Sequence, residues 1–276
     1  MPVQQLQDRI ILQHSKGSSA EILLYGATII SWKSADSTSP DLLERLFVSS
    51  KAALDGSKPV RGGIPVVFPQ HGFARNEVWN FDSVVMDAAA AVSVKLTLAP
   101  RPSIAAVYSQ DFELEYVVTL AEHQLSADLH IANPSQTSTL EFQALLHTYI
   151  RAPAQDVAIT PLTGKNFLDK TQSSPDARHK QENRTVVDVK QFTDAVYEDA
   201  PNTIHVAWPG GGLVLKMAGF KNVTIWNPQA DAGRKIGDME DEGWEHFVCV
   251  EPGYVLGFKE LAPSQRWIGH QVLSVL

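Results

Sequence analysis

The sequence is poor in cysteine and in membrane-directed features. Cys249 is the only cysteine among 276 residues, which excludes an intrachain disulfide and is typical of proteins from reducing compartments. The first residues carry no apolar stretch resembling a secretory signal. The longest apolar-rich segment, residues 22–32, is far too short to span a bilayer. These absences predict a soluble, cytoplasmic protein with no membrane partner.

Positive charge is also scarce. The chain has 23 Lys and Arg residues against 31 Asp and Glu residues, which gives a formal net charge of −8. Nucleic-acid binding requires a basic face, so the composition argues against a nucleic-acid partner. An anionic ligand would need a local cluster of arginines to overcome the surrounding negative field.

Sequence signatures of cofactor and metal chemistry are missing as well. The sequence has no glycine-rich loop of the dinucleotide or Walker type. Its nine histidines show neither an HExxH motif nor any other tight metal-ligand spacing. Heptad repeats and obvious self-complementary segments are also absent. We therefore expect no cofactor and no metal, and we expect a monomer.

What the sequence does contain is alternation of apolar and polar residues. In residues 92–98, 112–120 and 125–131, apolar side chains occupy every second position. Such a pattern places one face of a strand on a core and the other in solvent. Turn signals such as Asn133-Pro134 and Asn227-Pro228 separate the runs. Many short strands punctuated by turns predict an all-β fold, a large antiparallel β-sandwich, as a single domain spanning 1–276.

Helical periodicity is scarce. It predicts at most two short helices, at residues 49–55 and 190–195. The polar segment 169–190 is predicted to be an exposed excursion from the sandwich rather than a linker between domains.

A loop rich in glycine, proline and arginine occupies residues 60–76. Gly62 and Gly63 permit backbone conformations that are closed to other residues. The loop presents four polar side chains: Arg61, Gln70, His71 and Arg75. Because the arginine fork matches two phosphate oxygens at once, the loop is a candidate site for a polar, anionic ligand. A tight structural turn with solvated arginines is the alternative.

Three further residues are candidates for chemistry. His147 lies on a face of the predicted strand 140–151 that mixes polar groups with apolar bulk, as in a sugar-binding groove. Asp194 is placed to cap a short helix or to bond a turn. Glu251 ends an apolar strand directly before Pro252-Gly253, where partial desolvation would make it a better base near neutrality. A purely structural role is the alternative for each of the three.

These segments form an ordered series of motifs along nearly the whole chain. The series comprises Tyr25-Gly26-Ala27-Thr28, Val60-Arg61-Gly62-Gly63-Ile64-Pro65, Pro69-Gln70-His71-Gly72-Phe73-Ala74-Arg75-Asn76, Leu146-His147-Thr148-Tyr149, Thr193-Asp194-Ala195-Val196-Tyr197, Trp226-Asn227-Pro228 and Val250-Glu251-Pro252-Gly253. In order and spacing it resembles the aldose 1-epimerase superfamily, specifically its hexose-6-phosphate mutarotases (glucose-6-phosphate 1-epimerases). The resemblance implies the galactose mutarotase-like supersandwich fold.

The resemblance also implies roles for the candidate residues. His147 and Glu251 correspond to the catalytic pair of the family. Substrate contacts are implied for Arg61, Gln70, His71, Arg75 and Asp194. The form Asp-Arg-Val-Tyr that is common in the family reads Asp194-Ala195-Val196-Tyr197 here, so phosphate binding is expected to rest more heavily on Arg61 and Arg75.

The implied activity is interconversion of the α and β anomers of hexose 6-phosphates, chiefly D-glucose 6-phosphate. Opening the pyranose ring requires a base on the C1 hydroxyl and an acid on the ring oxygen, which we assign to Glu251 and protonated His147. This chemistry needs neither cofactor nor metal. The alternatives are an aldose 1-epimerase for unphosphorylated hexoses and a non-catalytic carbohydrate-binding protein, with a metal-dependent β-barrel enzyme a distant third.

Overall fold

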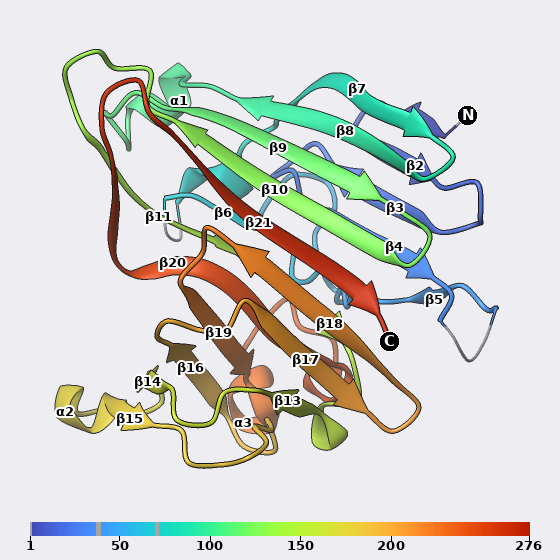
Figure 1. The fold of residues 1–276 in the computed structure, drawn as a ribbon, viewed down its shortest axis with the longest axis vertical. Coiled ribbons are helices and arrows are strands. Elements are labelled where there is room, and N and C mark those ends of the chain that lie inside the picture. The colour runs from blue at the N-terminus through green and yellow to red at the C-terminus, as the bar shows by residue number, and fades with distance from the viewer. Residues whose placement is uncertain (1, 37–39, 70–71) are drawn as a thin grey trace.

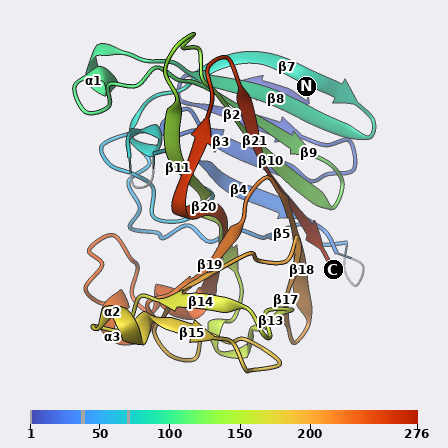
Figure 2. The same cartoon turned by 60° about the vertical axis from the view of Figure 1, so that its left-hand side comes forward.

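A computed structural model describes residues 2–36, 40–69 and 72–276 and consists mainly of three antiparallel sheets (Figure 1). The first sheet, ordered β1-β2-β3-β4-β5, contains β1 (Val3–Gln5), β2 (Arg9–Gln13), β3 (Ser19–Leu23), β4 (Ile29–Ser34) and β5 (Leu43–Glu44). In Figures 1 and 2 it lies behind the strands β7 to β10 of the second sheet.

The second sheet contains the C-terminal strand near its middle. In spatial order its strands are β13 (Ala158–Thr160), β17 (Thr203–Trp208), β18 (Gly211–Ala218), β21 (Arg266–Val275), β10 (Gln124–Ala132), β9 (Glu113–Leu120), β8 (Ala91–Leu98) and β7 (Asn80–Ala88).

The third sheet carries most of the motifs. In spatial order its strands are β15 (His179–Gln181), β14 (Asn166–Asp169), β16 (Thr193–Tyr197), β19 (Asn222–Asn227), β20 (Phe247–Leu261), β11 (Leu140–Leu146) and β6 (Val66–Val67). A further strand, β12 (Tyr149–Arg151), also pairs with β20.

Helices within the described residues are short. The α-helices are α1 (Pro102–Ala105), α2 (Pro175–Arg178) and α3 (Gln229–Gly233), and 3-10 turns cover Phe73–Asn76, Ala154–Asp156 and Gly243–His246. Within the described ranges, no helix is long and apolar enough to cross a bilayer.

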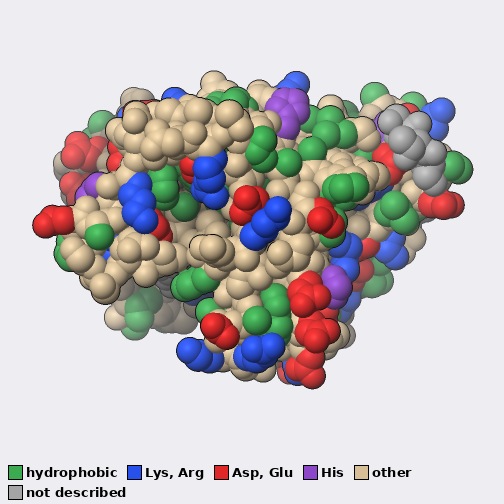
Figure 3. All heavy atoms as spheres, turned by 90° about the horizontal axis from the view of Figure 1, so that it is seen from below, with side chains coloured by type: hydrophobic (Ala, Val, Ile, Leu, Met, Phe, Trp, Pro, Cys, Tyr) green, Lys and Arg blue, Asp and Glu red, His purple; other side chains and the backbone are tan. Residues whose placement is uncertain are grey.

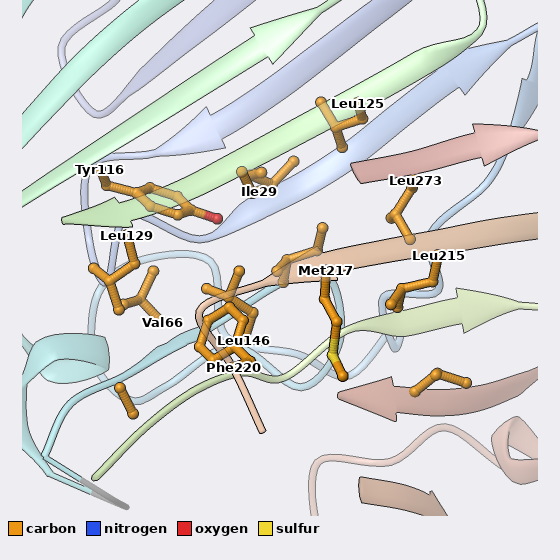
Figure 4. Close-up of a cluster of buried hydrophobic side chains, with 14 of the residues drawn as sticks. Ile29, Val66, Tyr116, Leu125, Leu129, Leu146, Leu215, Met217, Phe220 and Leu273 are labelled. Atoms are coloured by element: carbon orange, nitrogen blue, oxygen red, sulfur yellow. The ribbon is translucent and has the colours of Figure 1, made fainter. Parts of the chain in front are cut away.

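The predicted alternation is confirmed in the core. On β9, Leu114, Tyr116 and Val118 are fully buried, whereas Glu113 is exposed. Side chains from all three sheets meet in one buried cluster (Figure 4). The labelled members are Ile29, Val66, Tyr116, Leu125, Leu129, Leu146, Leu215, Met217, Phe220 and Leu273. The fold is therefore the predicted antiparallel β-sandwich.

Both predicted short helices are wrong. Residues 49–55 form turns, in which the Ser49 hydroxyl accepts a hydrogen bond from the Lys51 amide at 3.2 Å. Residues 193–195 belong to β16, because this segment extends the third sheet by pairing with β19. Valine and tyrosine later in the strand favour that extended state.

Two strand boundaries also differ from the prediction. Pro252-Gly253 makes no turn, because β20 continues for 15 residues and Pro252 pairs with Val223 of the neighbouring strand. Glu251 therefore lies within a strand and not at its end. The predicted strand 140–151 is in turn interrupted at His147 and Thr148, between β11 and β12.

Candidate active site

His147 occupies the interruption between β11 and β12, and the glycine-rich loop holds it there. Its amide donates to the Pro65 carbonyl at 3.1 Å, and the Tyr149 amide donates to the Gly63 carbonyl at 2.9 Å. The His147 ring stacks on the Tyr149 ring, with centroids 4.6 Å apart and planes at 9°. The loop thus fixes both the backbone and the ring plane of the histidine.

Glu251 faces His147 from β20. Its Oε1 lies 3.2 Å from His147 Nδ1, and its side chain is 5% exposed against 19% for the histidine. Burial raises the pKa of the Glu251 carboxyl well above its usual value, and the nearby Asp194 carboxylate raises it further. The ammonium of Lys170 opposes this effect on the pKa. The pair therefore combines a histidine with a buried carboxyl group whose raised pKa makes it a stronger base than an exposed glutamate.

The two side chains open into a cavity of about 150 Å³. Its lining residues are Val67, Leu145, His147, Lys170, Asp194, Thr224, Trp226 and Glu251. Lys170 Nζ lies 3.8 Å from Asp194 Oδ1, and the Trp226 ring meets His147 edge-on at a centroid distance of 6.0 Å. Asp194 also borders a polar groove of about 640 Å³ along β14 to β16. The cavity therefore offers acid, base, cation and aromatic surface to a polar ligand, with room beyond Asp194.

Arg61 and Arg75 do not line this cavity, but both lie near Tyr149, whose ring stacks on His147. Arg61 donates from Nε to Asp238 at 2.9 Å and from a terminal nitrogen to the Tyr149 hydroxyl at 3.2 Å. Burial lowers the pKa of the Arg75 guanidinium, and the positive charge of Arg61 lowers it further, whereas Tyr149 opposes this. Within the described part of the chain, the buried Nε of Arg75 has no hydrogen-bond partner. The two arginines therefore form a local positive centre with unfilled hydrogen-bonding capacity.

Charges of both signs are mixed on one outer face of the molecule. On the face seen from below in Figure 3, acidic and basic side chains are interspersed. In a chain of net charge −8, Arg61 and Arg75 are two neighbouring arginines of the kind that an anionic ligand would need.

The structure brings together most of the residues singled out in the sequence. His147, Glu251 and Asp194 line one cavity, and Arg61 lies one side chain away through Tyr149. Gln70 and His71 lie outside the described residues. Asp194 caps no helix, because it pairs with Trp226 inside the sheet.

Lys170 and Trp226 are cavity residues that the sequence analysis did not select. Lys170 belongs to the segment predicted to be an exposed excursion, and only the pairing of β14 with β16 carries it to the cavity. Trp226 lies in one of the motifs that carry the family resemblance, but the sequence analysis assigned no role to it.

The raised pKa of Glu251 gives a testable pH dependence of stability. A carboxyl whose pKa is higher in the folded state than in the unfolded state makes its full contribution to the free energy of unfolding at low pH. This contribution is lost as pH rises from the unfolded-state pKa toward the folded-state pKa. Glu251→Gln removes the titration. We expect its free energy of unfolding, relative to wild type, to increase as pH rises above about 4.3, by about 1.4 kcal/mol for each pH unit until the folded-state pKa is reached.

Urea denaturation of both proteins across a pH series measures this difference. Glu260→Gln replaces an exposed carboxyl on the same strand and is the matched control for the substitution itself. A Glu251→Gln difference that stays flat with pH would contradict the raised pKa.

The chain matches one family model over almost its full length. The model, described as aldose 1-epimerase, covers residues 8–274. A protein of Cenchrus ciliaris, provisionally named glucose-6-phosphate 1-epimerase, is 27% identical over 290 residues, which is 98% of this chain and 85% of that protein. An Escherichia coli (strain K12) protein with the same provisional name is 28% identical over 265 residues, or 90% and 83% of the two chains.

Solved structures share the fold. A provisionally named mutarotase from Salmonella typhimurium, YeaD, superposes with a TM-score of 0.86 at 23% identity, covering 99% of this chain and 92% of that one. A galactose mutarotase-like protein from Clostridium acetobutylicum gives a TM-score of 0.75 at 15% identity, with coverages of 99% and 97%. These matches confirm the predicted galactose mutarotase-like fold.

Proposed function

The chain belongs to the aldose 1-epimerase family, and from that premise we propose that it interconverts the α and β anomers of hexose 6-phosphates, chiefly D-glucose 6-phosphate. The observation that carries the proposal is the approach of His147 Nδ1 to Glu251 Oε1, at 3.2 Å, on the wall of a polar cavity. The provisional names of the relatives in Cenchrus ciliaris and Escherichia coli support the sugar phosphate as substrate.

We assign the proton transfers to that pair. Glu251 takes the proton of the C1 hydroxyl while protonated His147 gives a proton to the ring oxygen, and the bond between C1 and the ring oxygen breaks. The open-chain aldehyde turns about the C1–C2 bond, and the same groups, with roles reversed, close the ring on the other face. Each group acting as acid or base contributes about 10²–10⁴-fold.

The other cavity residues are suited to holding the sugar during this rotation. Asp194 and Lys170 supply a charged acceptor and a donor for ring hydroxyls. Trp226 supplies an aromatic wall for the apolar side of the ring. Gln70 and His71 remain proposed hydroxyl contacts on the strength of the family resemblance.

Arg75 supports the choice of a phosphorylated substrate. The buried Nε of Arg75 has no hydrogen-bond partner within the described residues, which is costly, and a phosphate carrying roughly −1.5 to −2 charges would be a strong acceptor for this guanidinium. Arg61 lies close enough to affect its pKa and is already held by Asp238 and Tyr149. We therefore propose that Arg75 makes the direct phosphate contact, with Arg61 as a preoriented second cation.

Arg75→Ala tests this assignment. Hydrogen bonds to charged groups contribute about 1.5–3 kcal/mol, so we expect KM for glucose 6-phosphate to rise roughly 10–100-fold. The KM for free glucose should change less than about twofold, because that sugar has no group to pair with the guanidinium. Initial rates of anomer exchange on both sugars provide the measurement.

Arg234→Ala is the matched control, since Arg234 is an arginine 67% exposed on the surface. It should leave both KM values at the wild-type level. An equal rise in KM for both sugars after Arg75→Ala would show that Arg75 supports the structure of the site and does not bind the phosphate. That result would favour the aldose 1-epimerase for unphosphorylated hexoses.

We also propose that residues 1–276 form one cytoplasmic, monomeric domain that works without a cofactor. One buried cluster that takes side chains from all three sheets supports the single domain. The single cysteine, a buried free thiol, is in keeping with a reducing compartment.

A further inference from the structure

A buried thiol lies directly beside the acid–base pair, and the proposed reaction assigns it no role. Cys249 precedes Glu251 by two residues on β20, so both side chains project from the same face of the sheet. The positions opposite Cys249 on the flanking strands are Tyr149 and Trp226, the two residues whose rings pack around His147. The strand register thus places the thiol beside the acid–base pair, although Cys249 does not itself line the cavity.

The donor atoms of this trio are close enough to share one ion. A ring nitrogen of His147, Sγ of Cys249 and a carboxylate oxygen of Glu251 all lie within 4.8 Å of one another. In a tetrahedral zinc site, bond lengths near 2.0–2.3 Å place neighbouring ligand atoms roughly 3.3–3.6 Å apart. The His147–Glu251 pair already stands at 3.2 Å, so movements of about 1 Å complete the geometry.

We propose that His147, Cys249 and Glu251 form a binding site for Zn²⁺ or a similar thiophilic divalent cation. One imidazole, one thiolate and one carboxylate match the preference of zinc, whereas Mg²⁺ and Ca²⁺ prefer oxygen ligands alone. Three protein ligands leave the fourth tetrahedral position for water or a sugar hydroxyl.

Charge balance favours the neutral complex in this buried place. Binding releases the thiol proton of Cys249 and any proton on Glu251 to solvent. The two resulting negative charges cancel the charge of the divalent ion, so no net charge is buried. Because a metal ion binds the deprotonated forms of thiol and carboxyl groups, it competes with protons, and affinity should increase with pH.

Occupation of this site blocks the proposed reaction, because the same ion ties up the acid and the base. This consequence rests on the proposed function, whereas the metal site itself does not. The metal site is therefore inhibitory. Cys249 contributes a soft ligand to it and takes no part in the proposed proton transfers.

Co²⁺ is a probe whose absorption spectrum detects metal binding at the site independently of enzymatic activity. Titration of the metal-free full-length protein with Co²⁺ should produce a thiolate-to-cobalt charge-transfer band in the near ultraviolet, and Zn²⁺ should abolish it by displacement. Cys249→Ser should lose the band and bind Zn²⁺ at least about 10–100-fold more weakly. Cys249→Ala repeats the test if serine in this buried place impairs folding.

His123→Ala, at a histidine about half exposed beside Glu122, controls for surface binding and should titrate like wild type. In the activity arm, Zn²⁺ should inhibit wild-type anomer exchange reversibly, and Cys249→Ser should keep most of the exchange rate while losing about the same 10–100-fold in Zn²⁺ sensitivity. A wild-type titration without the charge-transfer band, or equal affinity in both Cys249 variants and wild type, would overturn the site. An inactive wild type that still shows the band would overturn the proposed function alone.

Discussion

Replacing Glu251 by glutamine lowers kcat/KM for anomer exchange by about 10²–10⁴-fold, the range for loss of a general base. The amide keeps the shape of the side chain in a position that is 5% exposed, but it cannot take the proton of the C1 hydroxyl. His147→Asn should cause a loss of the same size, because it removes the acid that protonates the ring oxygen. Since the two groups act together in one ring-opening step, the double variant should lose little more than either single variant.

Anomer-exchange rates of the three variants, with substrate binding measured in parallel, test this prediction. Glu260→Gln, on the exposed part of the same strand, should exchange anomers at the wild-type rate. Binding of glucose 6-phosphate should persist in Glu251→Gln, because the amide still offers hydrogen bonds. Exchange at the uncatalysed rate in wild type and in both single variants, with binding retained, would favour the non-catalytic carbohydrate-binding alternative.

Replacing Gly63 by alanine should destabilise the protein more than any exposed-turn substitution. Gly63 has φ +68°, and a Cβ there would lie 2.2 Å from the carbonyl oxygen of Ile29. Left-handed strain of about 1–2 kcal/mol and displacement of backbone costing about 1–3 kcal/mol should together lower the free energy of unfolding by about 2–5 kcal/mol. Because the Gly63 carbonyl also holds Tyr149, exchange activity should fall with stability.

Gly164→Ala is the matched control for this substitution. Gly164 has a similar φ of +80°, but nothing lies within 4 Å of its added Cβ. It should therefore lose only the left-handed strain of about 1–2 kcal/mol. Thermal and urea unfolding of both variants separates the two contributions. Equal losses at Gly63 and Gly164 would show that the close approach to Ile29 has no energetic consequence.

The strands were predictable from the sequence where one face meets the core and the other meets solvent. On β9 the apolar positions are buried, as the alternation of residues 112–120 indicated. The errors occur where pairing with a distant strand overrides local preference. Pro252-Gly253 has the composition of a turn, yet β19 and β11 pair with β20 on either side and hold it extended.

In the candidate site, too, the sequence indicated individual residues, whereas their arrangement depends on the pairing of distant strands. The family resemblance selected His147, Glu251 and Asp194, which converge on one cavity although they come from three separate strand regions. Their convergence is a long-range property that no local pattern encodes. Lys170 was missed for this reason, because its segment is polar and its position depends on the pairing of β14 with β16. The nearness of Cys249 to the pair likewise follows from strand register.

Exchange NMR of the wild-type protein with glucose 6-phosphate, run beside free glucose, tests the central claim most directly. The account predicts cross-peaks between the α and β anomers of glucose 6-phosphate whose intensity grows with protein concentration. Free glucose at the same concentration should exchange much more slowly, because it cannot satisfy Arg75. Exchange of glucose 6-phosphate at the uncatalysed rate, or faster exchange of free glucose, would contradict the account.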